Sequence, residues 1–336
     1  MAVVSIQTPG SRVSLTSERL RIEGPEATEA SQPSPRTEIP LAEIERLVLG
    51  EGTNITSPAL RELLRRGVPV CFFDGRSRLL GSFEPSGPAH DAARLRQYRA
   101  ATDEAFALAV ARRLVESKIA NGRRLLQRLE ANHPRLDAAG LTRLMALQTE
   151  AAHIGPLDKL RGVEGAAATL FYEMWARFLP ADFPFERRSR RPPHNAVNAV
   201  LSYLATLLYG ECLSACYRAG LELGLGCLHA TEDGRWALPL DLMETFRPVL
   251  VESLTLRLFA WRVLQLGHFE ERDGGIFLNA GGRRALWEHY EQRLNREFFS
   301  EHAGCRTTLR TRIAQMPVHF KTCLEQPDLF SPFRLN

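Results

Sequence analysis

The spacing of apolar residues changes once along this 336-residue chain, and that change restricts the folds it can adopt. Before residue 84, short segments such as 12–16 (RVSLT) alternate apolar and polar side chains, which is the period of a β-strand. After the stretch 84–91 (EPSGPAHD), apolar residues recur every three or four positions over 91–131, which is the period of a helix. The sequence therefore predicts an α+β protein whose strands precede its helices.

A small β-rich N-terminal domain is predicted at 1–85, a linker at 86–92 and a larger all-α domain at 93–336. The length suits two domains, since roughly 100 to 200 residues per domain is usual. The helical patterns of the second domain cover 91–131, 164–179, 194–220, 248–266 and 281–299.

Turn and cap signals divide the N-terminal domain further. The motif TPGS at 8–11 is expected to join the first two strands in a hairpin or meander. A short helix is predicted at 57–67, followed by a buried strand at 68–74 that pairs antiparallel with 78–83. The remaining stretches are a polar loop at 23–38 and the segment 41–50, which fits a strand or a helix.

With 44% hydrophobic and 24% charged residues, the composition is that of a soluble globular protein. The longest lightly interrupted apolar run, 199–210, is shorter than the roughly 18 residues of a membrane span, so no transmembrane helix or membrane partner is expected. No secretory signal is recognised at the N-terminus, and a cytoplasmic location is expected. The six cysteines form no CxxC pair and are predicted to be buried thiols.

The basic residues are almost all arginine: lysine occurs three times, against 43 − 3 = 40 arginines. A GC-rich genome explains such a bias, and so does bidentate binding of phosphate groups. Four arginines, Arg187, Arg188, Arg190 and Arg191, lie within five positions ahead of two prolines. Such a segment is either a solvated surface or a phosphate-binding one, and the clustering favours nucleic-acid binding.

The segment 226–246 (GCLHATEDGRWALPLDLMETF) places His229, Asp241 and Glu244 among apolar residues, where unpaired charges are costly. A tight turn or short hairpin is expected around TEDG, with His229 at its edge. If the stretch after Pro239 is helical, the two acids three positions apart share one face.

A third carboxylate, Glu164, is expected at the start of an apolar helix. One imidazole and two or three carboxylates are suitable ligands for magnesium or manganese. Each residue also has a purely structural explanation: Glu164 suits a helix N-terminal dipole, Asp241 a helix cap, and His229 a hydrogen-bonded core position.

Several ordered blocks of the sequence resemble one known family. They are NITSPALRELLRRGVPVCFFD, RGVEG, RRPP followed by AVNAVLSYLATLLY, GCLHA, GRWALPLDLMETFRP, FLNAGGRRALWEHYE and DLFSPFRLN. Together they resemble the CRISPR-associated endonuclease and integrase of spacer acquisition, the first-numbered Cas protein family, over most of the chain.

The resemblance implies a β-rich N-terminal domain and a helical catalytic domain, and an enzyme that joins 3′-OH ends of short duplex DNA into a CRISPR repeat. It implies Mg²⁺ or Mn²⁺ held by Glu164, His229 and Glu244, with Asp241 supporting the site. It also implies a homodimer that assembles with a dimer of the small second-numbered Cas protein on protospacer and repeat DNA. The arginine cluster is expected to hold the DNA backbone.

Three positions depart from the family pattern: Asn195 and Ala196 stand where an aspartate and a proline are frequent, and Ala205 stands where a tyrosine is frequent. Two other functions compatible with the residues are a stand-alone metal-dependent nuclease for branched or single-stranded DNA in repair, and a non-catalytic DNA-binding scaffold.

Overall fold

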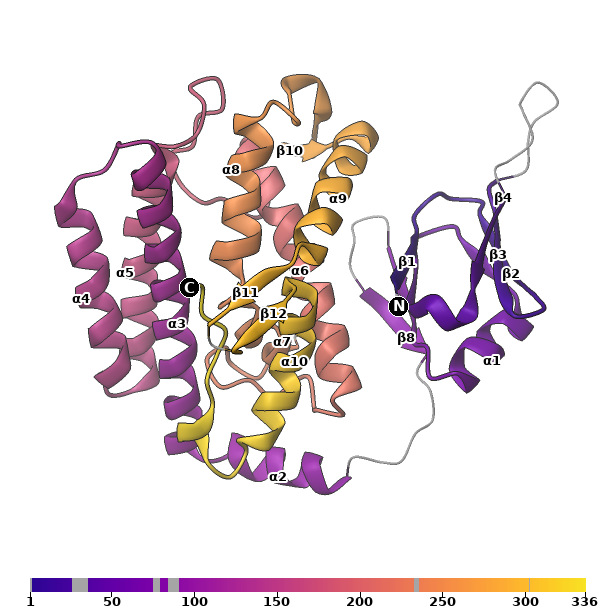
Figure 1. The fold of residues 1–336 in the computed structure, drawn as a ribbon, viewed down its shortest axis with the longest axis horizontal. Coiled ribbons are helices and arrows are strands. Elements are labelled where there is room, and N and C mark those ends of the chain that lie inside the picture. The colour runs from indigo at the N-terminus through magenta and orange to yellow at the C-terminus, as the bar shows by residue number, and fades with distance from the viewer. Residues whose placement is uncertain (1, 26–35, 75–78, 84–90, 233–235, 302) are drawn as a thin grey trace. The chain divides into compact units, whose positions relative to one another are not determined.

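The computed structural model describes residues 2–25, 36–74, 79–83, 91–232, 236–301 and 303–336. The chain divides into two compact units, Met1–Ala89 and His90–Asn336 (Figure 1). Strands make up most of the first unit and helices most of the second, so the predicted α+β fold is confirmed. The predicted linker 86–92 spans the boundary between the units, and its residues 86–90 lie outside the described part.

Two four-stranded sheets build the first unit. One has the order β1-β5-β7-β8, formed by Ala2–Ile6, Ile44–Leu49, Val70–Phe73 and Leu79–Phe83, with only the last pair antiparallel. The other has the order β4-β3-β2-β6, formed by Arg36–Pro40, Arg19–Glu23, Arg12–Thr16 and Asn54–Ile55. The core of this unit includes Val13, Leu20, Leu47 and Leu63, and Leu63 belongs to helix α1 (Ser57–Arg65).

The predicted hairpin between the first two strands is wrong. The chain does turn at TPGS, where Ser11 N–H donates to the carbonyl of Thr8, but the turn carries it from one sheet to the other. Gly10 has φ +82°, which favours glycine, and its N–H donates to Gly52. β1 consequently pairs in parallel with β5, a long-range partner that local turn signals do not reveal.

Other details of this unit differ from the prediction or complete it. The loop expected at 23–38 contains the start of β4, which pairs antiparallel with β3, while its residues 26–35 lie outside the described part. The ambiguous 41–50 becomes a 3₁₀ turn, Leu41–Glu43, followed by strand β5. The predicted antiparallel partner of 68–74 is confirmed as β8, and residues 75–78 lie outside the described part.

The second unit consists of α2 (Asp91–Ala101), α3 (Glu104–Asn132), α4 (Ala138–His153), α5 (Leu157–Ala176), α6 (Ala196–Arg218), α7 (Ala237–Met243), a π-helical turn η2 (Pro248–Glu252), α8 (Ser253–Ala260), α9 (Ala280–Asn295) and α10 (Leu309–Thr322). The helix predicted over 91–131 is interrupted before Asp103, whose carboxylate accepts hydrogen bonds from the first N–H groups of α3.

This unit is not purely helical, which corrects the predicted all-α domain. It also holds two short hairpins, β9–β10 (Phe269–Arg272 and Gly275–Leu278) and β11–β12 (Phe298–Ser300 and Cys305–Thr307), and the short 3₁₀ turns Leu266–His268 and Pro327–Leu329. The hairpins are too short to give a recognisable alternating pattern.

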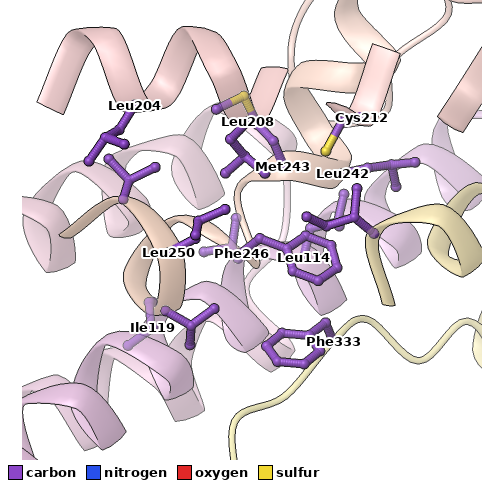
Figure 2. Close-up of a cluster of buried hydrophobic side chains, with 14 of the residues drawn as sticks. Leu114, Ile119, Leu204, Leu208, Cys212, Leu242, Met243, Phe246, Leu250 and Phe333 are labelled. Atoms are coloured by element: carbon purple, nitrogen blue, oxygen red, sulfur yellow. The ribbon is translucent and has the colours of Figure 1, made fainter. Parts of the chain in front are cut away.

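Helices α3 and α6 meet α7 and η2 in one continuous core, which also takes in the C-terminal residues (Figure 2). Leu114, Leu208, Met243 and Phe246 are all buried there, and the ring of Phe333 stacks on Phe246 with centroids 4.8 Å apart. This packing fixes α3, α5 and α7 against each other and sets the positions of the polar side chains they carry.

Helix α6 is long and apolar enough to cross a membrane by length and composition. Its residues Val197, Leu201, Leu204 and Leu208 are buried within the helical core, which accounts for its hydropathy. Five of the six cysteines are buried free thiols as predicted, whereas Cys305 on β12 is exposed.

Candidate metal centre

Glu164 lies on α5, which packs along α3. The helix begins at Leu157, so Glu164 is about two turns inside it, and the explanation that it complements the helix N-terminal dipole is wrong. Its neighbours Val163 and Ala167 are buried in the core, while the Glu164 side chain keeps 27% exposure. The carboxylate is therefore held at the edge of the core.

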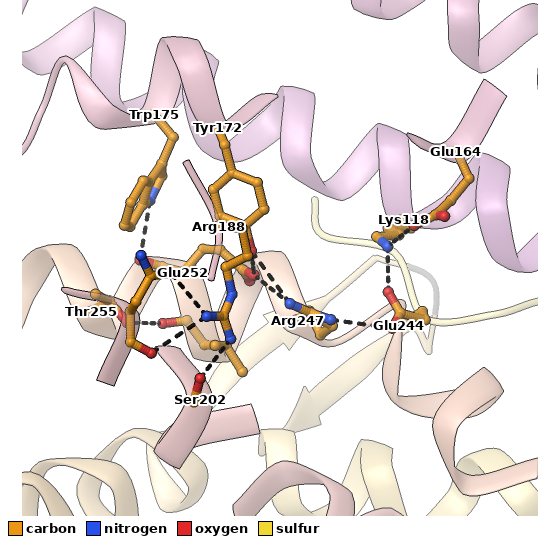
Figure 3. Close-up of polar contacts among 12 residues, drawn as sticks. Lys118, Glu164, Tyr172, Trp175, Arg188, Ser202, Glu244, Arg247, Glu252 and Thr255 are labelled. Carbon is orange, nitrogen blue, oxygen red and sulfur yellow. Dashed lines mark hydrogen bonds and ion pairs between the residues drawn. The ribbon is translucent and has the colours of Figure 1, made fainter. Parts of the chain in front are cut away.

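Lys118 of α3 extends its side chain between the carboxylates of Glu164 and Glu244 (Figure 3). Its Nζ contacts Oε1 of Glu164 and Oε2 of Glu244, and its side chain is 17% exposed. Burial on its own lowers the pKa of Lys118, but the two carboxylates outweigh burial and raise that pKa. One ammonium group thus brings together two acids from separate helical segments.

Glu244 is the C-cap of α7 and is 6% exposed. Besides its contact with Lys118, its Oε1 lies 3.3 Å from the guanidinium of Arg247. Burial on its own raises the pKa of Glu244, but the charges of Lys118 and Arg247 outweigh burial and lower it well below its usual range. Glu244 is consequently ionised at neutral pH.

Asp241, which is 1% exposed, orients His229. Its Oδ1 accepts the backbone N–H of His229 at 2.9 Å and lies 2.7 Å from Nδ1 of that ring, while its Oδ2 accepts the N–H groups of Cys227 and Leu228. A carboxylate only accepts, so Nδ1 carries a proton, and in the neutral ring the lone pair is on Nε2. Carboxylates orient metal-ligating histidines in this way. Asp241 is thus a positioning residue and not a helix cap.

Gly226 permits the close approach of this loop to Asp241. A Cβ at position 226 would lie 2.6 Å from Cβ of Ala237, 2.8 Å from the carbonyl oxygen of His229 and 3.0 Å from Oδ2 of Asp241. The predicted hairpin is wrong, since described residues 225–230 are irregular and Ala237–Met243 is helical. The loop N–H groups are satisfied by the Asp241 carboxylate and need no strand partner. Asp233 and Gly234 of TEDG lie outside the described part.

A buried polar network continues from Glu244 (Figure 3). The guanidinium of Arg247 lies 3.4 Å from Oε1 of Glu252 and donates to the hydroxyl of Tyr172 at 3.3 Å, and that hydroxyl donates to the same Oε1 at 2.8 Å. Burial and the charge of Glu252 raise the pKa of Tyr172 to about 12, so the hydroxyl stays protonated. Positive and negative groups therefore alternate from Lys118 to Glu252.

The structure separates Arg188 from the three other arginines predicted to bind DNA. Its guanidinium donates to Oδ1 of Asn198 at 2.9 Å and to the hydroxyl of Ser202 at 3.0 Å, both on α6, and burial lowers its pKa to about 10. Arg188 therefore fixes the segment 187–191 to α6, a structural role that the sequence did not predict. Sequence alone could not separate it from its neighbours, because all four precede the same prolines.

Arg187, Arg190 and Arg191 are exposed, and within the described part of the chain their guanidinium groups form no ion pair. Asn195, one of the departures from the family pattern, caps α6 by accepting the N–H of Asn198 at 2.8 Å, a contact that an aspartate makes equally well. Ala196 and Ala205 are partly buried against the core.

The donor set suits a divalent metal, although Lys118 lies where the two glutamates converge. In the described residues no three His, Cys, Asp or Glu side chains already surround a common point. Two ionisable carboxylates meeting at one cation, and an imidazole whose Nε2 is free, are nevertheless appropriate ligands for Mg²⁺ or Mn²⁺. Glu164, His229 and Glu244 are the residues that would hold it.

Comparison with known proteins identifies the family. The profile described as CRISPR associated protein Cas1 matches residues 4–292. The chain belongs to the Cas1 family. The resemblance inferred from the ordered sequence blocks is thereby confirmed.

A Thermus thermophilus protein named CRISPR-associated endonuclease Cas1 1 is 36% identical to this chain over 299 residues. The match covers 88% of this chain and 90% of the Thermus protein. A CRISPR-associated exonuclease Cas4/endonuclease Cas1 fusion from Rhodospirillum rubrum is 36% identical over 314 residues; the match covers 91% of this chain but only about half, 53%, of the fusion. A casposase bound to integration product shares the fold, with a TM-score of 0.83 at 21% identity over 96% of this chain and 90% of that one.

Sequence reasoning missed Lys118, Arg247 and Tyr172. Lys118 is distinctive in the sequence, because it is one of three lysines beside 40 arginines (43 − 3). Nothing in its local sequence, however, links it to Glu164 and Glu244, which lie 46 and 126 positions away (164 − 118 and 244 − 118). Tyr172 lies in an apolar helical pattern that is typical of core residues, and Arg247 lies immediately before another such pattern.

Proposed function

We propose that this chain is a metal-dependent DNA integrase and endonuclease of CRISPR adaptation. Membership of the Cas1 family and the names of its relatives support a nuclease, and the fold shared with a casposase is consistent with strand joining. The observation that carries the metal-dependent part is the convergence of Glu164 and Glu244 on one cation, together with a histidine that Asp241 orients and that lies close enough to act electrostatically on Glu244.

In the proposed reaction, the oxygen of a terminal 3′-OH on a short duplex bonds to a phosphorus atom of the CRISPR repeat. The P–O bond to the neighbouring nucleotide breaks, and that oxygen leaves as a new hydroxyl. A bound divalent ion would activate the attacking hydroxyl, or water in the cleavage reaction, and offset negative charge in the transition state.

The chain's own residues prepare this site. Asp241 fixes the ring of His229 with Nε2 available, and Lys118 and Arg247 keep Glu244 ionised. Glu164 supplies the second carboxylate from α5. The exposed Arg187, Arg190 and Arg191 would hold the DNA backbone without reading its sequence.

The partners proposed from the family resemblance are protospacer DNA, the CRISPR repeat, a second copy of this chain and a dimer of the small second-numbered Cas protein. The test combines the full chain and that small protein with a labelled 3′-OH duplex, a supercoiled plasmid carrying the repeat, and Mn²⁺ or Mg²⁺. Label is expected to enter the plasmid, to be lost with EDTA and to return when Mn²⁺ is added in excess. A duplex with 3′-dideoxy ends is the matched control, since it lacks the attacking hydroxyl.

The outcomes separate the candidate functions. Joining that continues undiminished in EDTA would remove the metal-dependent mechanism. Metal-dependent cleavage of branched or single-stranded DNA without any joining would favour a repair nuclease. DNA binding without joining or cleavage in the presence of any divalent ion would favour the third candidate function, a non-catalytic DNA-binding scaffold.

Replacing Arg187, Arg190 and Arg191 together by alanine should weaken binding to every duplex sequence alike. The slope of log K against log salt concentration should become shallower by up to about 2.7, since each phosphate contact contributes about 0.9 on duplex DNA. Fluorescence anisotropy at several salt concentrations measures this. Arg188→Met is the control from the same segment: its slope should match wild type while its thermal stability falls, and an equal slope change in both variants would contradict the assignment.

A further inference from the structure

Lys118 occupies the point where the two proposed carboxylate ligands converge. Its Nζ contacts one oxygen of Glu164, from α5, and one oxygen of Glu244, at the end of α7, while Lys118 itself comes from α3 (Figure 3). Its side chain is 17% exposed, and those of the two acids are 27% and 7% exposed. A positive charge thus already sits between acids that the proposed function assigns to a divalent metal.

The use of lysine at this position is unusual for this chain. Arginine supplies 40 of the 43 basic residues (43 − 3), and of the other two lysines Lys159 is exposed and Lys321 donates to the carbonyl of Ala219. An ammonium is a compact point charge, whereas a guanidinium is a broad planar fork. Between two converging carboxylates, the compact ammonium acts as a single point charge, with one positive charge where a divalent ion carries two.

The two acids require a cation in the absence of metal. Carboxylates held close together repel each other, and uncompensated charge is strongly unfavourable at a buried position such as that of Glu244. Of the two oxygens of Glu244, Arg247 pairs with Oε1 and Lys118 with Oε2, and Glu164 has no other ion pair within the described residues. The ammonium is therefore the group that holds Glu164 and Glu244 together.

The same oxygen atoms cannot serve the ammonium and a metal ion at the same point, because the two cations would repel at contact distance. Resting on the metal-dependent function proposed above, we propose that Lys118 occupies the cation position in the metal-free protein and is displaced from the carboxylates when a divalent ion binds. Lys118 is then a positioning residue. It keeps the acids convergent without metal and weakens metal binding by competition.

The test measures Mn²⁺ binding to the full chain by calorimetry after removal of metals with EDTA, without DNA and without an activity assay. Lys118→Met should bind Mn²⁺ about 10- to 100-fold more tightly than wild type, the range by which groups around metal ligands alter affinity. The same variant should unfold at a lower temperature than wild type in EDTA and gain more from Mn²⁺, since a ligand stabilises the state it binds. Tighter metal binding together with a less stable metal-free state is a combination that a purely structural lysine would not give.

Three further variants complete the design. Lys118→Gln is neutral but still donates a hydrogen bond, and should show the same tightening if the methionine variant folds poorly. Lys159→Met removes one exposed lysine of α5 and should leave both affinity and stability unchanged. Glu244→Gln should lose Mn²⁺ binding.

Equal or weaker Mn²⁺ binding by the neutral Lys118 variants, alongside wild-type binding that Glu244→Gln abolishes, would overturn the competition while leaving the metal site intact. A lack of Mn²⁺ binding in wild type and in every Lys118 variant would overturn the metal site itself, and the competition with it. Binding that appears only after Lys118 is neutralised supports the proposal most strongly.

Discussion

His229→Ala is expected to lower the rate of metal-dependent strand joining by about 10³-fold. The ring of His229 is the proposed nitrogen ligand, and its loss leaves two carboxylates to hold the metal. Roughly 4 kcal/mol of transition-state stabilisation corresponds to such a factor, and a catalytic metal contributes several kcal/mol. Joining of a labelled 3′-OH duplex into a repeat-bearing plasmid, in the presence of the small Cas partner, measures the rate.

Two other variants show whether this loss comes from the metal site. Asp241→Asn keeps the size of the side chain but removes the charge that orients the ring, so metal affinity should fall about 10- to 100-fold and excess Mn²⁺ should restore part of the rate. His153→Ala, at the exposed end of α4, removes a histidine whose hydrogen bond within the described residues is to the carbonyl of Thr149, and it should have no effect. A joining rate for His229→Ala within threefold of wild type would contradict the ligand assignment.

Local patterns in the sequence predicted the elements well but not their long-range pairing. The helix at 57–67 ends as predicted, because Gly67 with φ +77° follows the last turn of α1. By contrast, β1 pairs with β5, about forty residues further on, and the turn at TPGS gave no indication of that partner. Period and turn chemistry are local properties, whereas sheet order is set by packing between distant segments.

The candidate site shows the same division. Spacing and family resemblance named Glu164 and Glu244, and the structure brings them together through Lys118. Asp241 was ranked as a supporting residue, and its four contacts with the loop 227–229 agree with that rank. Lys118 could not be inferred, since its role depends on two acids from other helices. Arg188 was predicted to bind DNA together with its neighbours. The lower solvent exposure of its side chain, which distinguishes it from them, cannot be inferred from a run of arginines.

The second large effect is expected on stability, from Arg247→Met. The Arg247 side chain is 9% exposed and lies between Glu244 and Glu252, at 3.3 and 3.4 Å, with Tyr172 as a further partner. Methionine has a similar volume, so the substitution removes charge more than packing. Breaking a buried ion pair by removing one partner costs about 3–5 kcal/mol, because the remaining charge is left uncompensated. The free energy of unfolding of the helical unit should fall by that amount.

Urea unfolding followed by tryptophan fluorescence isolates this unit, since all four tryptophans, Trp175, Trp236, Trp261 and Trp287, lie in His90–Asn336. Arg306→Met is the matched control: its ion pair with Glu297 is exposed on both sides, 72% and 63%, and pairs of that kind contribute less than about 1 kcal/mol. If the free energy of unfolding falls by less than about 1 kcal/mol in both variants, the stability of the buried network does not depend on Arg247. If only Arg247→Met unfolds at a lower urea concentration, the guanidinium of Arg247 has two effects. It keeps Glu244 ionised for metal binding, and it stabilises the surrounding core, because Glu252 and Tyr172 contact the same group.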